Sequence, residues 1–188
     1  GYCVKRQLPV VLATTGYSED QLLEIESAAR SIPVFRSANF SLGINVLSKL
    51  ARQAARLLGE DYDIEIVERH HNKKVDAPSG TALLLAEALS EALPYEPEYV
   101  WDRHAVRRPR DRREIGISSI RGGTIAGDHE ILFAGRDELI ELRHSAQSRE
   151  VFASGALKAA RFLAQCRAPG LYNMDDLLDW LQTPSEAE

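Results

Sequence analysis

The segment Asp63–His70 constrains the fold of this chain more than any other. Ile64 and Ile66 fall on one of its faces and Glu65 and Val67 on the other, the alternation typical of a strand in a sheet that covers a core. Two histidines and two lysines stand together where this strand ends. Because α/β enzymes place their chemistry at strand ends and in the loops that follow them, this end is the first place to look for a site.

The first third of the sequence predicts a parallel crossover unit. Residues 9–14 form a short apolar run that suits a strand buried on both faces. Ser18 and Gln21 then make a capping box at the start of an amphipathic helix, and residues 33–37 read as the next strand. A strand, a helix and a second strand with short links indicate part of a doubly wound sheet.

Further helices are predicted by apolar residues at helical spacing. One ends at Gly59, one begins at Ser79 and stops before Pro94, and a short one begins at Asn173 and runs through Trp180. Residues from 183 onward are expected to form a polar tail. The residues expected to be buried are Leu47, Leu50, Ala54 and Leu58 in the first of these helices, and Phe152, Ala156, Ala159 and Leu163 in a helix over 148–166.

Between Tyr99 and Gln147 the chain is expected to be mostly β. Residues 114–121 and 124–134 flank Gly122 and Gly123, which is a hairpin signal, and a second turn is expected at 135–137. Such a run predicts an open antiparallel or mixed sheet. The arginine-rich segment 103–113 is interpreted as a solvated face or an interface arm.

Composition excludes several classes of function. A net charge of -5 argues against nonspecific nucleic-acid binding, and no apolar run approaches the length of a membrane span. Two distant cysteines favour a cytoplasmic protein with reduced thiols. No metal site is predicted, because the remaining histidines do not stand at the spacing of metal ligands; these are His104, His129 and His144.

The residues after the strand suit a small anionic ligand. His70 is of a type that titrates near neutral pH and can exchange a proton, and Lys74 brings a positive charge and a possible acid. The Ser79-Gly80-Thr81 turn is a helix cap, and it is also a cradle in which free amides at the helix start can hold a carboxylate. Both interpretations of the turn can hold together.

The run from Glu68 to Ala82 resembles the signature of the dihydrodipicolinate reductase (4-hydroxy-tetrahydrodipicolinate reductase) family. The family pattern is a glutamate, paired histidines, a lysine four positions after the first histidine, and Asp-Ala-Pro-Ser-Gly-Thr-Ala, and every position is matched here. Later segments follow the family in order, among them Arg121–Gly123, Gly127–His129 and His144–Arg149. The resemblance covers nearly the whole chain.

The resemblance implies reduction of 4-hydroxy-tetrahydrodipicolinate with NADH or NADPH, in lysine and diaminopimelate biosynthesis. It implies His70 as the proton donor or acceptor and Lys74 as the second acid. A small dicarboxylate would be held by His71, Ser79, Gly80 and Thr81. The cofactor would contact Ala13, which replaces a family glycine, together with Thr14, Thr15, Ser37, Ala38, Asn39 and Phe40.

The fold that the resemblance implies is α/β. Residues 1–37 would be the remnant of a Rossmann-type nucleotide-binding domain, residues 38–155 an α+β substrate and oligomerisation domain with a mixed open sheet, and residues 156–188 helices that return to the nucleotide domain. A homotetramer is expected. No G-x-G-x-x-G follows a strand, so we expect an incomplete form that, alone, binds the cofactor too weakly to turn over. The alternatives are a non-catalytic dicarboxylate-binding and oligomerisation module, or another Rossmann-linked reductase.

Overall fold

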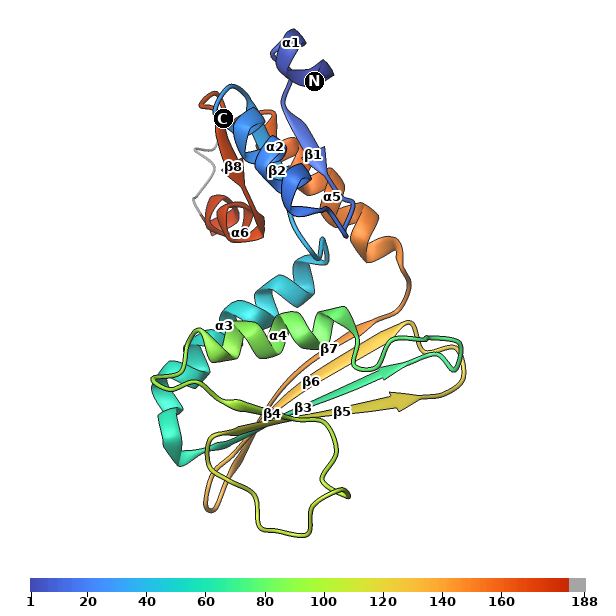
Figure 1. Ribbon diagram of the computed structural model, residues 1–188, viewed down its shortest axis with the longest axis vertical. Helices are drawn as coiled ribbons and strands as arrows, with labels where there is room; N and C mark the ends of the chain where they lie inside the picture. Colours follow the sequence, from blue (N-terminus) through green and yellow to red (C-terminus); the bar gives the residue numbers. More distant parts are fainter. Residues whose placement is uncertain (183–188) are drawn as a thin grey trace. The chain divides into compact units, whose positions relative to one another are not determined.

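The computed structural model describes residues 1–182, and the chain divides into two compact units. The first unit contains Gly1–Asn45 and the segment from Glu150 onward, and the second contains Val46–Arg149. Figure 1 shows the helices and strands of each unit. The predicted polar tail from residue 183 lies outside the described residues.

The first unit is built on a three-stranded parallel sheet. Its order is β1 (Val10–Leu12), β2 (Pro33–Arg36) and β8 (Gly170–Tyr172). The predicted strand-helix-strand unit is present, because α2 (Glu19–Ala29) joins β1 to β2 and begins with the expected capping box at Ser18. Strand β8 was not predicted, since three residues are too few to carry a periodic pattern.

Aromatic side chains make the core of the first unit. Phe35 of β2 packs on Phe40 and, edge to face, on Phe162 of α5 (Glu150–Leu163). Helix α6 (Met174–Gln182) adds Leu177 to this core, and Asn173 accepts hydrogen bonds from the amides of its first turn. A short helix, α1 (Tyr2–Arg6), precedes β1.

Two predicted helix faces need correction. In α3 (Leu42–Leu58), Leu50 is 46% exposed, and the buried residues are Ile44, Leu47, Ser48, Ala51 and Ala55. In α5, Phe152 is 41% exposed, whereas Gly155, Ala159, Phe162 and Leu163 are buried. Both helices bury small residues, Ala51 and Ala55 in α3 and Gly155 and Ala159 in α5, and a search for large apolar residues overlooks such a face. Helix α3 ends as expected before Gly59, which has a left-handed φ of 57°. Gly59 is also the first residue of the short 3-10 helix η1 (Gly59–Asp61).

The second unit contains a mixed five-stranded sheet in the order β4-β5-β3-β6-β7. Strand β3 is parallel to β5 and antiparallel to β6, and β6 is antiparallel to β7. Strand β4 is parallel to β5. The bounds are β3 (Asp63–His70), β4 (Glu98–Val100), β5 (Glu114–Arg121), β6 (Gly127–Ala134) and β7 (Leu139–Ala146).

The predicted hairpin at Gly122 and Gly123 is therefore wrong. Strand β3 lies between the two strands that this turn connects. The Gly122 amide donates to the carbonyl oxygen of His70, and the Asn72 amide donates to that of Gly123, so the turn crosses the end of β3. A glycine pair signals a tight turn but does not report which strands pair. The second predicted turn, between β6 and β7, does form a hairpin.

One face of this sheet carries the core of the second unit. Helices α3 and α4 (Gly80–Ser90) cover that face (Figure 1). Alternate residues of β3 are buried there, and Glu68 and His70 continue the row begun by Ile64 and Ile66. The apolar row therefore turns polar at the carboxyl end of β3, where the site begins.

Candidate active site

A buried carboxylate lies at the centre of the candidate site. Glu68 is 0% exposed, and its two oxygens accept hydrogen bonds from both terminal nitrogens of Arg121, at 2.6 and 2.8 Å. The Ser79 amide donates to the same carboxylate at 3.1 Å. His70 Nδ1 lies 2.6 Å from Glu68 Oε2. One side chain thus connects β3, β5 and the start of α4.

This environment keeps Glu68 ionised. Burial alone would raise the pKa of its carboxyl, but the hydrogen bonds from Arg121, His70 and Ser119 outweigh burial and lower the pKa to about 2. Its opposite charge raises the pKa of Arg121 in turn, through their hydrogen bonds. A buried ion pair with this many donors is tolerated because each lone pair of the carboxylate finds a partner.

A second histidine lies beside the first. His129 of β6 stands next to Glu68 in the sheet register, and its ring is edge to face with that of His70 at 5.2 Å between centroids. Its Nε2 lies 3.0 Å from the hydroxyl of Ser79. Burial, and then the charge of His70, lower the pKa of His129 to about 4, so this ring is neutral at neutral pH.

The loop after β3 carries two further predicted site residues, His71 and Lys74. His71 Nε2 lies 3.3 Å from a terminal nitrogen of Arg149, which follows β7 in the chain. Lys74 Nζ lies 2.8 Å from Asp76, whose pKa is lowered chiefly by this hydrogen bond. His71 and Lys74 are half-buried, so both are accessible to a ligand.

The first two residues at the start of α4 differ: Ser79 is buried and hydrogen-bonded, whereas Gly80 is exposed. Ser79 is the N-cap, and its hydroxyl accepts from the Ala82 amide at 3.1 Å while its own amide is bound to Glu68. Gly80 is exposed, and a Cβ placed on it would meet no atom within 4 Å. The first turn of a helix offers amides without intrahelical partners, so Gly80 marks the open part of the predicted cradle.

The predicted cofactor residues all lie in the first unit. Ala13, Thr14 and Thr15 form an exposed loop after β1, and residues 37–40 follow β2. The second loop is well ordered by its own hydrogen bonds, because Ser37 Oγ donates to the Asn39 carbonyl oxygen at 2.8 Å. The two strands are parallel neighbours, so both loops leave the same edge of that sheet.

Four residues of the second unit that the sequence did not single out belong to the site. Glu68 and Arg121 stood inside matched segments without an assigned role, His129 was interpreted as structural, and Arg149 was only part of a matched segment. A signal existed for Glu68, since residues two apart on a strand share a face and Glu68 precedes His70 by two. No local pattern predicts Arg121, which depends on the pairing of β5 with β3.

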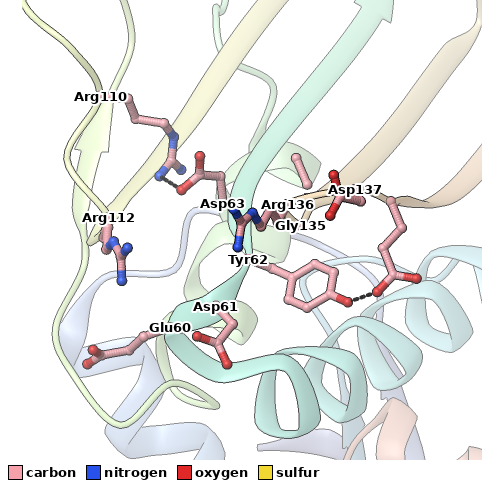
Figure 2. A pocket seen from close by; sticks show the side chains of 11 residues that line it. Glu60, Asp61, Tyr62, Asp63, Arg110, Arg112, Gly135, Arg136 and Asp137 are labelled. Atoms are coloured by element: carbon pink, nitrogen blue, oxygen red, sulfur yellow. Dashed lines mark hydrogen bonds and ion pairs between the residues drawn. The ribbon is translucent and has the colours of Figure 1, made fainter.

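An open pocket of about 900 Å³ lies at the other end of β3. Figure 2 shows its charged lining, with Asp63 and Arg110 joined by an ion pair and Tyr62 donating to Glu138. The lining of this pocket carries both acidic and basic side chains. It lies an eight-residue strand away from His70, and none of the predicted site residues lines it.

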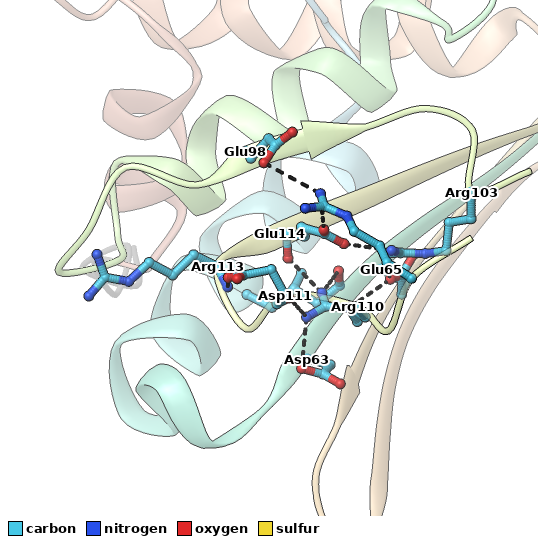
Figure 3. Close-up of polar contacts among 10 residues, drawn as sticks. Asp63, Glu65, Glu98, Arg103, Arg110, Asp111, Arg113 and Glu114 are labelled. Atoms are coloured by element: carbon cyan, nitrogen blue, oxygen red, sulfur yellow. Dashed lines mark hydrogen bonds and ion pairs between the residues drawn. The ribbon is translucent and has the colours of Figure 1, made fainter. Parts of the chain in front are cut away.

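The arginine-rich segment is bound to the amino ends of β3 and β5. Figure 3 shows Arg103 bridging Glu65 and Glu114, with both contacts at 2.5 Å. Arg110 also donates to the carbonyl oxygens of Ile64 and Glu114, at 2.9 and 2.5 Å. These arginines neutralise acidic groups of the sheet, so their charge is not available to a nucleic acid.

Two negative findings apply to residues 1–182. Within this range no helix is long and apolar enough to cross a membrane. The same residues contain no group of three or more histidine, cysteine, aspartate or glutamate side chains that could hold a metal ion.

Both parts of the chain match family profiles. Residues 43–178 match the profile described as dihydrodipicolinate reductase, C-terminus. Residues 1–40 match the profile described as dihydrodipicolinate reductase, N-terminus. Together the two profiles span both structural units.

Individual relatives agree with the profiles. The chain is 58% identical over 174 residues to the 4-hydroxy-tetrahydrodipicolinate reductase of Caldanaerobacter subterraneus subsp. tengcongensis, covering 93% of this chain and 68% of the relative. It is 51% identical over 178 residues to that of Clostridium tetani, covering 95% and 69%. Among solved structures, the dipicolinate-bound dihydrodipicolinate reductase of Paenisporosarcina sp. TG-14 superposes with a TM-score of 0.73 at 27% identity, covering 91% of this chain and 64% of that one. The chain thus spans about two thirds of the length of these relatives.

Proposed function

The chain belongs to the dihydrodipicolinate reductase family, and from this premise we propose that its second unit binds 4-hydroxy-tetrahydrodipicolinate for nicotinamide-dependent reduction to tetrahydrodipicolinate. This reaction is a step of lysine and diaminopimelate biosynthesis. The observation that supports the proposal most directly is that the accessible side chains of His71 and Lys74 follow β3 in the loop that leads to the exposed Gly80 at the start of α4. A dipicolinate-bound relative supports a flat dicarboxylate as the ligand.

The two carboxylates of the substrate would be held by different residues of this segment. One would lie against Gly80 and Thr81, where the amides and the positive end of α4 favour an anion. His71 would bind the other with Lys74. Arg149 contacts His71, and its guanidinium is suited to a carboxylate, so we add it to the substrate-binding residues.

His70 and Lys74 would act as the proton-transfer residues of this reaction. When bound, a reduced nicotinamide supplies a hydride to the substrate, and the electron-rich product must then gain a proton. We assign this transfer to His70, and we assign Lys74 as the second acid. Both stand at the carboxyl end of β3 or in the loop that follows it, beside the open start of α4.

The loops after β1 and β2 fit the nicotinamide end of a cofactor. Thr14 and Thr15 are exposed hydroxyls, and Ser37 and Asn39 hold the second loop in a fixed shape at the same edge of parallel strands. We propose Ala13, Thr14, Thr15 and residues 37–40 as the cofactor contacts. NADH and NADPH remain equal candidates, because no residue of these loops is charged.

We further propose a cytoplasmic homotetramer. The face of the five-stranded sheet away from α3 and α4 carries exposed apolar side chains, with Leu139 at 52% and Ile120 at 46%. Burying such a face between copies removes apolar surface from water and protects the edge strands. Sedimentation of the purified protein tests this, since a monomer at high concentration would contradict it.

The reductase assignment is tested by substrate-dependent oxidation of NADH or NADPH by the purified protein. The assay is run up to high cofactor concentration, since the expected affinity is low. Oxidation that requires 4-hydroxy-tetrahydrodipicolinate supports the proposal. A folded protein that binds dipicolinate but oxidises neither cofactor would favour the binding-module alternative, and oxidation driven only by other imino or hydroxy acids would favour another reductase.

A further inference from the structure

The contact between Glu68 and His70 fixes which nitrogen of the imidazole carries hydrogen. The carboxylate already accepts two hydrogen bonds from Arg121 and one from the Ser79 amide. An ionised carboxylate can only accept. His70 Nδ1, at 2.6 Å from Glu68 Oε2, must therefore be the donor.

The other ring nitrogen is left open. Within residues 1–182, His70 Nε2 has no hydrogen-bond partner, although the residue is only 8% exposed. A Cβ placed on Gly127 would lie 3.0 Å from Nε2 and 3.4 Å from Cδ2 of the ring. Glycine at position 127 thus leaves room against the ring where any other residue would press on it.

We propose that Glu68 is a positioning residue that holds His70 as the Nδ1–H tautomer, so that Nε2 is the nitrogen that exchanges a proton with the substrate, and that Arg121 holds Glu68 in place. The inference rests on the proposed reductase function for the role of that proton. The proposed function does not state which nitrogen of His70 is reactive, and we assign Nε2 to that role, with Glu68 and Arg121 as the residues that determine the tautomer.

The variant Glu68→Gln distinguishes a role in setting the His70 tautomer from a role in supporting the start of α4. Its amide oxygen can still accept from the Ser79 amide and from one terminal nitrogen of Arg121, so the start of α4 keeps its support, while the hydrogen bond from the other Arg121 nitrogen is lost. Its amide nitrogen would then face Nδ1 and donate to it, which favours the Nε2–H tautomer. Glu130→Gln is the matched control, because Glu130 also pairs with an arginine of the same sheet, Arg69 at 2.8 Å, but does not contact His70.

The experiment combines nitrogen NMR of labelled histidines with turnover and dipicolinate binding. In the wild-type protein without ligand, we expect neutral His70 to carry its hydrogen on Nδ1. In Glu68→Gln we expect the Nε2–H tautomer, a kcat reduced by about 10–100-fold, as for other partners that orient a reactive imidazole, and dipicolinate affinity and KM within about 2-fold of wild type. Glu130→Gln should match the wild type in the His70 tautomer, kcat, dipicolinate affinity and KM.

A wild-type His70 with its hydrogen on Nε2 would overturn the inference without any variant. Should Glu68→Gln fail to fold, Glu68→Asp keeps the charge opposite Arg121 while withdrawing the carboxylate from Nδ1, and we expect a mixed tautomer and reduced kcat. Normal kcat in either folded variant would overturn the inference and leave the reductase assignment standing. Absence of wild-type turnover agrees with the expected weak cofactor binding, and the tautomers then decide: the same tautomer of His70 in the wild type and in Glu68→Gln would overturn the inference.

Discussion

The hydroxyl of Ser79 and Nε2 of His129 lie 3.0 Å apart inside the second unit, where neither residue is more than 4% exposed. This contact connects α4, the helix that would hold a substrate carboxylate, to strand β6. Because the ring of His129 also lies edge to face with that of His70, its charge state affects both Ser79 and His70.

The first prediction is a loss of stability in mild acid. An unfolded histidine titrates near 6.5, whereas burial lowers the pKa of folded His129 to about 4. Below 6.5 the unfolded chain therefore binds a proton that the folded chain does not, so the contribution of His129 is present above 6.5 and is lost as the pH falls to about 4. The full loss is on the order of 3 kcal/mol.

Urea unfolding at a series of pH values measures this loss. In His129→Gln, which can still bond to Ser79, the free energy of unfolding should change much less between pH 6.5 and 4. The variant His104→Gln, in an exposed loop, should follow the wild type. Glu68 adds a separate loss at lower pH, between its ordinary value of 4.5 and about 2. An unchanged slope in His129→Gln would show that another group causes the acid effect.

The second prediction concerns the proton-transfer residues. In the intact enzyme, replacing His70 with glutamine or Lys74 with methionine should lower kcat by about 10²–10⁴-fold, since each variant removes a positioned acid or base. Single-turnover kinetics at saturating cofactor give the rate of the chemical step. Near-normal rates in either variant would remove that residue from the mechanism.

The third prediction separates two neighbouring arginines of the loop shown in Figure 3. The Arg110 side chain is 16% exposed and bonds to Asp63, Glu65 and three backbone carbonyls, so Arg110→Met should lower the free energy of unfolding by about 1–3 kcal/mol. Arg112 is exposed, and its replacement should stay within about 0.5 kcal/mol of wild type. Equal effects of the two variants would contradict the described network.

The fourth prediction tests the core of the first unit. A Cβ at Gly155 of α5 would lie 1.7 Å from the carbonyl oxygen of Phe40, which is backbone and cannot turn aside. Gly155→Ala should therefore destabilise the protein by about 1–3 kcal/mol or more, although alanine is the better helix former. Thermal unfolding beside the exposed control Ser154→Ala measures this, and a stabilised Gly155→Ala would refute the close contact.

Local sequence patterns predicted the strand and the helix that carry the site. They could not predict which strands pair with each other. The alternation of Asp63–His70 and the cap at Ser79 predicted β3 and α4 because both signals lie within a few residues. The place of β3 between β5 and β6 could not be predicted, since strand order depends on contacts between distant residues. For the same reason the sequence showed His70 and Lys74 but not Arg121, which reaches Glu68 across the sheet.

The most direct test of the account is a calorimetric titration of dipicolinate into the wild-type protein and Gly80→Ala. Nothing lies within 4 Å of a Cβ at Gly80, and alanine suits a helix, so the variant should fold as well as the wild type. The added methyl group would occupy the space in which a carboxylate approaches the start of α4. We predict saturable binding to the wild type and at least about 10-fold weaker binding to Gly80→Ala, equal to ~1.4 kcal/mol, with Gly122→Ala, another glycine with open space, unchanged. Equal binding to the wild type and Gly80→Ala, or none to the wild type, would contradict the assignment of this helix start as the dicarboxylate site.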